Sequence, residues 1–214
     1  MKLDRLEPLA QSGQVKLVFS DGSVLKTQPY LVSDFGLCAG LELDDEQMQA
    51  LYAAAKKASA RERAVRIVAA SGVSEKELKK RLVQKGEDAL DAAQAVDWLK
   101  ELKLVDDAKT AEQLVASAAA KGYGRARIRN LLYEKSIPRE YWDEALARVP
   151  PMDDALDRFL RQRLKGCDPD EKTLKKTVDA LLRRGHSWGD IQAALRRYQT
   201  GLELEEDEWM EEME

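Results

Sequence analysis

The chain has 214 residues, of which 44% are hydrophobic and 35% are charged, and its formal net charge is −4. This composition is typical of a globular protein with many exposed helices, and the length suffices for one elongated domain or two small ones. It contains no apolar run near the ~18 residues that span a bilayer and no apolar signal-peptide core, so we expect a cytoplasmic protein without membrane contact.

Residues suited to catalysis or metal binding are scarce. His186 is the only histidine, and the two cysteines, Cys38 and Cys167, lie far apart and outside any Cys-x-x-Cys spacing. In a reducing compartment such cysteines are expected to be free thiols. Because no carboxylate pair, nucleophile–base pair or metal cluster stands out, we predict a protein that is not an enzyme and that has no catalytic residue, cofactor or metal.

The charges are unevenly distributed along the chain. Residues 60–199 hold 29 basic and 23 acidic side chains, whereas residues 200–214 hold eight acidic side chains and no basic one. A basic body can bind phosphate or an acidic protein surface, and an acidic tail can compete for the same face. We therefore expect an acidic partner, and we expect the tail, residues 200–214, to be disordered.

Residues 14–27 predict a β-hairpin. Val15 and Leu17 alternate with polar neighbours, and Asp21-Gly22 is a two-residue turn of the kind that hairpins favour. An isolated hairpin is only marginally stable. We therefore expect it to pack on a neighbour or to gain a strand from residues around 41–43.

A long helix is predicted after the hairpin, with Asp44 or Asp45 as its capping residue. Its apolar spacing is interrupted by polar residues near 58–63, where we expect a bend or a joint. Residues 1–58 would then form an N-terminal module that contains the hairpin and the linking helix.

Helix signals continue along the rest of the chain. Ser74 and Glu77 have the spacing of a capping box. Pro138 suits the first turn of a helix that runs to about residue 148, and Asp168-Pro169 starts a later helix. These signals predict a series of short helices from about residue 60 onward.

The glycine, histidine and tryptophan residues of this region are expected to have structural roles rather than to form a site. The segment Gly122-Tyr123-Gly124 lacks the preceding strand and the Gly-Lys-Ser/Thr of a phosphate-binding loop, so it predicts a helix break. His186 is expected to begin a turn. The tryptophans expected to pack in helical cores are Trp98, Trp142 and Trp188.

The same helix ending occurs three times. The segments RLVQKG, NLLYEKS and ALLRRG end at Gly86, Ser136 and Gly185, which are 50 and 49 residues apart. Each has a leucine four residues before its end and a basic residue one residue before it. Three helices per period predict a mainly α fold, in which tandem three-helix repeats form an elongated, curved array behind the N-terminal module. The expected repeats are residues 59–106, 107–149 and 150–199.

The middle helix of each repeat is the main candidate for partner or DNA binding. Cations that recur on its exposed face would form a positive stripe able to meet phosphate or an acidic protein surface. Two interpretations stay open, because the same cations could simply solvate an exposed helix face, and the tyrosine among the candidates could be packed rather than exposed. The candidate residues are Lys76, Lys79, Lys80, Lys85, Tyr123, Arg125, Arg127, Arg129, Lys135, Lys172, Lys175, Lys176, Arg183 and Arg184.

Four motifs follow one another in a fixed order and spacing: Ser74-x-x-Glu77-Leu78-x-x-x-Leu82-x-x-Lys85-Gly86, Leu104-Val105-Asp106-Asp107, Gly124-x-x-x-Ile128-x-x-x-Leu132-x-x-Lys135 and Ile137-Pro138. In these motifs the chain resembles the RecX family, the regulatory proteins of the bacterial recombinase RecA. The similarity covers residues 60–198, with Thr110 where the family usually has an aromatic residue and Ser136 where it usually has glycine.

The resemblance implies a regulatory protein without enzymatic activity. Family members dock in the groove of the RecA filament on single-stranded DNA and inhibit or modulate its ATPase and strand exchange during recombination, DNA repair and the SOS response; some also bind DNA directly. We accordingly expect a monomer whose partner is the RecA filament. Two alternatives stay open: a helical-repeat protein that binds nucleic acid without RecA, and an adaptor for some other protein.

Overall fold

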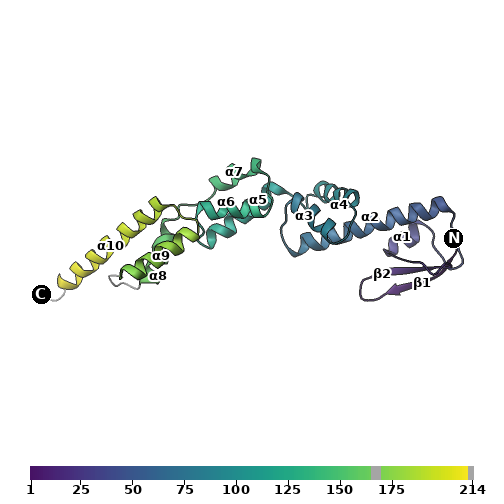
Figure 1. The fold of residues 1–214 in the computed structure, drawn as a ribbon, viewed down its shortest axis with the longest axis horizontal. Coiled ribbons are helices and arrows are strands. Elements are labelled where there is room, and N and C mark those ends of the chain that lie inside the picture. Colours follow the sequence, from purple (N-terminus) through teal and green to yellow (C-terminus); the bar gives the residue numbers. More distant parts are fainter. Residues whose placement is uncertain (165–169, 212–214) are drawn as a thin grey trace. The chain divides into compact units, whose positions relative to one another are not determined.

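The computed structural model describes residues 1–164 and 170–211, with side chains described as far as residue 200 (Figure 1). Its elements are one small antiparallel sheet followed by helices, so the predicted mainly α fold with an N-terminal β-hairpin module is confirmed. The chain divides into two compact units, Met1–Asp106 and Asp107–Glu214.

The predicted hairpin is present as strands β2 (Gln14–Phe19) and β3 (Val24–Thr27). Gly22 has a φ of +83°, which the turn requires and which glycine adopts without strain. The Asp21 carboxylate accepts hydrogen bonds from the backbone and the side chain of Ser23, at 2.9 and 2.6 Å, and these bonds lower the pKa of Asp21. Local turn chemistry therefore explains why this part of the sequence forms a hairpin.

The third strand of the sheet is β1 (Leu3–Leu9), which pairs antiparallel with β2 so that β2 is central. Of the two expectations for the hairpin, packing on a neighbour is confirmed, since its Leu17 shares a buried core with Met48 and Leu51. Residues around 41–43 do not form a strand, since Glu42 makes only an isolated bridge to Lys2. Pro8 lies in β1, and an edge strand tolerates a residue that lacks a backbone N–H. Leu3 nevertheless is fully buried and anchors β1 to the core of the module.

Helix α1 (Pro29–Asp34) is followed by the long helix α2 (Asp45–Ala70), which Asp44 and Gln47 cap reciprocally. The bend expected near residues 58–63 is wrong, because α2 is one continuous helix of 26 residues. Alanine, arginine and glutamate dominate the polar stretch, and all three favour the helix. The apolar side chains of α2 pack in two cores, Met48 and Leu51 with the sheet and the later ones with the first group of short helices.

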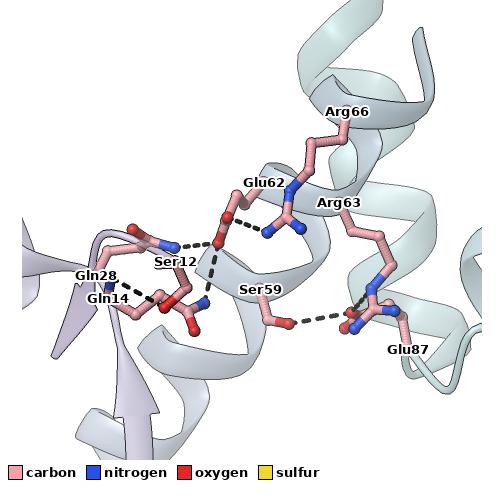
Figure 2. A network of polar contacts seen from close by, with 8 residues as sticks. All are labelled: Ser12, Gln14, Gln28, Ser59, Glu62, Arg63, Arg66 and Glu87. Carbon is pink, nitrogen blue, oxygen red and sulfur yellow. Dashed lines mark hydrogen bonds and ion pairs between the residues drawn. The ribbon is translucent and has the colours of Figure 1, made fainter. Parts of the chain in front are cut away.

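Polar side chains on one segment of α2 bind the sheet (Figure 2). The Glu62 carboxylate accepts hydrogen bonds from the side-chain amides of Gln14, at 3.1 Å, and Gln28, and it pairs with Arg66 one turn later. Gln14 belongs to β2 and Gln28 follows β3, so one carboxylate holds the end of the sheet against the helix.

The neighbouring face of the same segment binds the other side of the unit (Figure 2). Glu87, in the connection between α3 (Glu75–Gln84) and α4 (Ala89–Glu101), accepts hydrogen bonds from Arg63 Nε at 2.7 Å and from Ser59 Oγ at 3.0 Å. Its side chain is only 9% exposed, which strengthens these charged contacts. Helix α2 therefore joins the sheet and the first three-helix group within one compact unit.

The first three-helix group consists of the second half of α2 with α3 and α4, which bury one continuous core. Ser74 caps α3 as predicted, since its Oγ accepts a hydrogen bond of 3.2 Å from the Glu77 amide. Trp98 packs against this core with its ring 4.8 Å from the Arg61 guanidinium. The prediction that Trp98 is a packing residue is confirmed.

The second group consists of α5 (Asp107–Ala120), α6 (Arg125–Glu134), a 3₁₀ turn (Arg139–Tyr141) and α7 (Trp142–Ala147). The single helix predicted from Pro138 to about residue 148 is wrong, because Pro138 caps the 3₁₀ turn and α7 has only six residues. Ser136 adopts a φ of +55° after α6, the left-handed conformation that glycine adopts after α3 and α9. Trp142 packs on this core and donates its Nε1–H to the Ile137 carbonyl at 3.0 Å.

The third group consists of α8 (Asp153–Leu164), α9 (Glu171–Arg183) and α10 (Trp188–Glu211). Asp170 caps α9; the predicted helix start, Asp168-Pro169, lies outside the described residues. Trp188 is 55% exposed, so its predicted packing role is wrong. The tail was expected to lack structure, yet α10 continues to Glu211, which fits the good helix propensity of its Glu and Leu residues.

Candidate interaction surface

The middle helices α3, α6 and α9 bury the same two positions relative to their ends. These positions lie eight and four residues before Gly86, Ser136 or Gly185. The first of them is apolar in α3 and α6 but holds Thr177 in α9. The buried Thr177 hydroxyl has a partner there, because it donates a hydrogen bond of 2.8 Å to the Thr173 carbonyl. These residues define the buried side of each helix, and the opposite side carries mostly exposed residues. The six buried residues are Leu78, Leu82, Ile128, Leu132, Thr177 and Leu181.

Most of the predicted contact residues lie on that solvent-facing side. Eleven of the 14 are exposed: Lys76, Lys79, Lys80, Lys85, Arg125, Arg129, Lys135, Lys172, Lys175, Lys176 and Arg183. The other three, Tyr123, Arg127 and Arg184, are half-buried. Tyr123 packs against the core of the second group, and the Arg184 guanidinium lies 4.7 Å from the Phe159 ring.

An open basic hollow of about 380 Å³ lies beside α3 in the first unit. Two of its cations are paired with carboxylates one turn away on their own helices, Arg66 with Glu62 and Arg81 with Glu77 at 2.8 Å. Pairs of this kind on a surface are weak and rearrange at little cost when an anion binds. The lining residues are Arg63, Arg66, Ile67, Ala70, Ser71, Arg81 and Lys85.

A second open hollow, of about 390 Å³, lies beside α6 and combines cations with aromatic rings. The Arg139 guanidinium lies 5.8 Å from the Trp142 ring, and Tyr133 is 71% exposed. Rings with an exposed face next to arginine suit a protein side chain or an unstacked base. The lining residues are Ala126, Arg129, Asn130, Tyr133, Arg139 and Trp142.

The glycines of the predicted helix break also form a contact with the turn after α9. The Gly124 amide donates to the Arg184 carbonyl at 2.8 Å, and the Ala126 amide donates to the Gly185 carbonyl at 3.1 Å. A Cβ on Gly124 would lie 2.2 Å from the Gly185 oxygen, so the two backbones approach too closely for any side chain at this position. We call this backbone contact of residues 122–127 with 184–186 the glycine joint.

The sequence predicts the break between α5 and α6 but does not reveal the glycine joint. The only signal was that Gly124 begins a helix without a side chain able to cap it. The joint accounts for two of the half-buried candidates, because Arg127 and Arg184 lie at the close approach of the two backbones. Tyr123 is half-buried because it packs against the core of the second group.

His186 completes the glycine joint. It was expected only to begin a turn, but the residue is 6% exposed and its Nε2 lies 3.0 Å from the Gly122 carbonyl oxygen. Because a carbonyl only accepts, Nε2 carries the hydrogen in this contact. Burial lowers the pKa of His186 below its usual value; the Gly122 carbonyl and Asp190 oppose this shift, and the nearby Arg184 charge adds to it.

The lowered pKa of His186 predicts a pH-dependent joint. The neutral ring stabilises the folded unit above the unfolded pKa of about 6.5, and this contribution is lost as the pH falls through the folded pKa. We therefore expect the wild-type unit Asp107–Glu214 to lose more stability between pH 7.5 and 5.5 than the His186→Gln variant, whose amide also donates to Gly122 but does not titrate. Urea denaturation at each pH measures the difference, and parallel pH profiles would contradict the assignment.

Other kinds of site find little support in the described part of the chain. Among those residues there is no group of three or more histidine, cysteine, aspartate or glutamate side chains placed to hold a metal ion. None of the described helices is both long and apolar enough to cross a membrane. The basic, partly aromatic faces of the middle helices are therefore the candidate interaction surface.

Known proteins resemble this chain in sequence over most of their length. A family model described as the second three-helix domain of RecX matches residues 106–146, which contain α5, α6 and all but the last residue of α7. A regulatory protein RecX of Chlorobaculum tepidum is 34% identical over 145 residues, which cover 66% of this chain and 89% of the relative. The chain belongs to the RecX family. The RecX of Cronobacter sakazakii is also 34% identical, and the match covers 64% of this chain and 91% of the relative. The RecX of Escherichia coli K12 is 33% identical, and the match covers 64% of this chain and 90% of the relative.

Solved structures of RecX proteins share the fold. One crystal structure of a regulatory protein RecX has a TM-score of 0.62 and 21% identity and covers 91% of this chain and 98% of its own. The structure of RecX from Lactobacillus salivarius has a TM-score of 0.57 and 18% identity, and the match covers 68% of this chain and 97% of that one. Because the first of these covers so much of the chain, the likeness extends into the N-terminal module as well as the three-helix groups. The RecX relatives are named regulatory proteins, which agrees with a binding surface rather than a catalytic one.

Proposed function

We propose that this RecX-family protein binds the RecA filament on single-stranded DNA and inhibits or modulates its ATPase and strand exchange during recombination, DNA repair and the SOS response. The observation that carries the proposal is the 34% identity to regulatory RecX proteins over about nine tenths of their length. The exposed cations of α3, α6 and α9 support it, since they suit an acidic protein surface and DNA phosphates alike.

We further propose that residues 59–106, 107–149 and 150–199 act as three similar contact units. Each has a core of its own, which contains the repeated leucine (Leu82, Leu132 or Leu181), and each carries exposed cations on its middle helix. Several weak contacts on one chain add up to a strong one when the partner offers several equivalent sites. A filament of identical subunits has this property, and a single globular partner does not.

Binding assays with three targets test the proposal. The protein is titrated against RecA filaments on single-stranded DNA, against the same DNA alone and against RecA without DNA. We expect the filament to bind far more tightly than either component at the same salt concentration. Equal affinity for bare DNA and the filament would contradict the proposal and favour a DNA-binding protein for which RecA is irrelevant.

A direct nucleic-acid-binding function is the second candidate, and the hollow beside α6 favours it. Its exposed Tyr133 and the Arg139–Trp142 pair offer surfaces on which bases stack. This candidate predicts strong salt dependence with bare nucleic acid, with a log–log slope that reports several phosphate contacts. It also predicts that the slope is the same with and without RecA.

The acidic tail is expected to weaken partner binding. Residues 203–214 hold eight acidic side chains and no basic one, so they attract the same cations as an acidic partner. Deleting them should tighten filament binding by roughly threefold to tenfold at ~50 mM salt and by less at ~500 mM, where screening is strong. A full-length variant with Gln and Asn in place of these acidic residues removes the charge of the tail but keeps its length, and it should bind as tightly as the deletion. Affinities equal to that of the wild type in both variants would contradict an inhibitory role of the tail charge.

A further inference from the structure

The three middle helices each expose one large apolar side chain on the side away from the core. These are Val83 in α3, Tyr133 in α6 and Leu182 in α9, which are 45%, 71% and 44% exposed. Each follows directly after a fully buried leucine, so the helical turn of ~100° per residue directs it away from the core that the leucine fills. None of the three is needed to complete a core.

The three side chains occupy one and the same position of the repeated pattern. Each lies three residues before the residue that ends the helix pattern, which is Gly86, Ser136 or Gly185. A single exposed apolar residue is ordinary on a protein surface and needs no explanation. Of the eleven large hydrophobic side chains that are exposed within the described residues, however, three fall at this one position. A recurring apolar residue without a core role indicates a contact outside the chain.

Exposed cations lie on the same helix face as the apolar position. In α3, Lys79 and Lys80 lie one turn before Val83; in α6, Arg129 lies one turn before Tyr133. Residues three and four apart are neighbours on a helix, so these two apolar side chains are bordered by positive charge. In α9 the exposed Lys175 lies two turns before Leu182, and the residue one turn before it is the exposed Asp179.

The chemistry of the apolar residues decides which kind of partner fits. Valine and leucine neither stack on bases nor form hydrogen bonds with them, so burying them against nucleic acid gains little. Against a protein, the same side chains gain the full hydrophobic stabilisation of a shallow apolar patch, while the neighbouring cations meet carboxylates at its border. The partner surface is therefore a protein surface with an apolar centre and an acidic rim.

The recurrence of the position decides the form of that partner. One surface of this chemistry would engage one apolar residue, but the chain offers three equivalent ones at intervals of 50 and 49 residues. We infer that Val83, Tyr133 and Leu182 are equivalent apolar contacts for neighbouring identical subunits of a protein polymer. The inference rests on the proposed function, in which that polymer is the RecA filament, and it assigns the tightest part of the binding to protein rather than to DNA.

A triple substitution tests the inference in the full chain. The variant V83S/Y133S/L182S is compared with a control, L90S/L102S/L104S, which removes three exposed leucines outside the repeated position. Thermal denaturation checks that both variants fold like the wild type. We expect the first variant to lose at least about 100-fold in affinity for RecA filaments, since each lost contact costs roughly tenfold and the three act together. The control should stay within about threefold of the wild type.

Binding to bare single-stranded DNA distinguishes the outcomes. The double variant V83S/L182S keeps Tyr133, whose ring can stack on bases. We expect it to bind bare DNA within about twofold of the wild type, because aliphatic side chains add little to nucleic-acid binding, and still to lose affinity for the filament by roughly tenfold or more. Equal losses on DNA and on the filament would overturn the inference in favour of a nucleic-acid contact. Wild-type-like filament binding by the variant would overturn the inference alone, whereas failure of the wild type to bind filaments would overturn the proposed function with it.

Discussion

Gly124→Ala is expected to open the glycine joint and to destabilise the unit Asp107–Glu214 by about 2–4 kcal/mol. The added methyl carbon would lie 2.2 Å from the Gly185 oxygen and 2.4 Å from the His186 nitrogen. Both neighbours are backbone atoms, which cannot turn aside as a flexible side chain would. Relief of the clash therefore requires the second and third helix groups to separate, with loss of the hydrogen bonds from the Gly124 and Ala126 amides.

The control for this variant is Gly189→Ala. Gly189 lies in the first turn of α10, and a Cβ there would meet only the Ser187 hydroxyl, at 3.8 Å. Alanine stabilises a helix relative to glycine, so this variant should be neutral or more stable by up to about 1 kcal/mol. Amide hydrogen exchange at residues 124 and 126, together with urea denaturation, measures both effects. Slow exchange retained in Gly124→Ala would show that the joint tolerates a side chain.

Leu132→Asp is expected to unfold the second three-helix group. Leu132 is fully buried in α6, in a core that it shares with α5 and α7. An unpaired carboxylate in so small a core loses its hydration and leaves apolar neighbours unfilled, which costs more than about 4 kcal/mol. Most of the stability of a domain of this size would be lost.

Asn130→Asp provides the matched control, since it places the same charge on the exposed face of the same helix. Hydrogen exchange of the amides in α5, α6 and α7 should rise to near-unfolded rates in Leu132→Asp and should be unchanged in Asn130→Asp. A melting curve of Leu132→Asp like that of the wild type would show that the assigned buried face of α6 is wrong.

Local sequence signals predicted the elements that depend on neighbouring residues. The Asp21-Gly22 turn fixed the hairpin, and the Ser74 cap fixed the start of α3, because both act over two or three residues. The spacing of Leu82, Leu132 and Leu181 likewise identified the buried face of each middle helix, since period and burial are coupled in amphipathic helices.

Features that depend on distant parts of the chain were not predictable in this way. Strand β1 contains charges and Pro8, so it shows no strong strand pattern, and its pairing comes from β2 and from the burial of Leu3. The glycine joint links residues about 60 apart, and nothing in the sequence around Gly124 indicates which backbone approaches it. In α2 the apolar spacing predicted a break that does not occur, because the residues of the polar stretch are good helix formers.

The candidate surface was predictable in its charges but not in its division of roles. The sequence placed Tyr123, Arg127 and Arg184 among the contact residues, whereas the structure places Arg127 and Arg184 at the glycine joint and packs Tyr123 against the core of the second group. The aligned helix endings already contain Val83, Tyr133 and Leu182, but only the structure shows that their side chains are exposed. Exposure is a tertiary property, which depends on how other elements cover a helix.

The single-stranded-DNA-dependent ATPase of RecA, titrated with this protein, tests the central claim most directly. We expect ATP hydrolysis to fall as the wild-type protein is added and to stay unchanged with V83S/Y133S/L182S at the same concentrations. Deleting residues 203–214 should move the wild-type response to lower concentration. An ATPase rate that is unchanged at one wild-type molecule per RecA subunit would contradict a role in modulating the RecA filament.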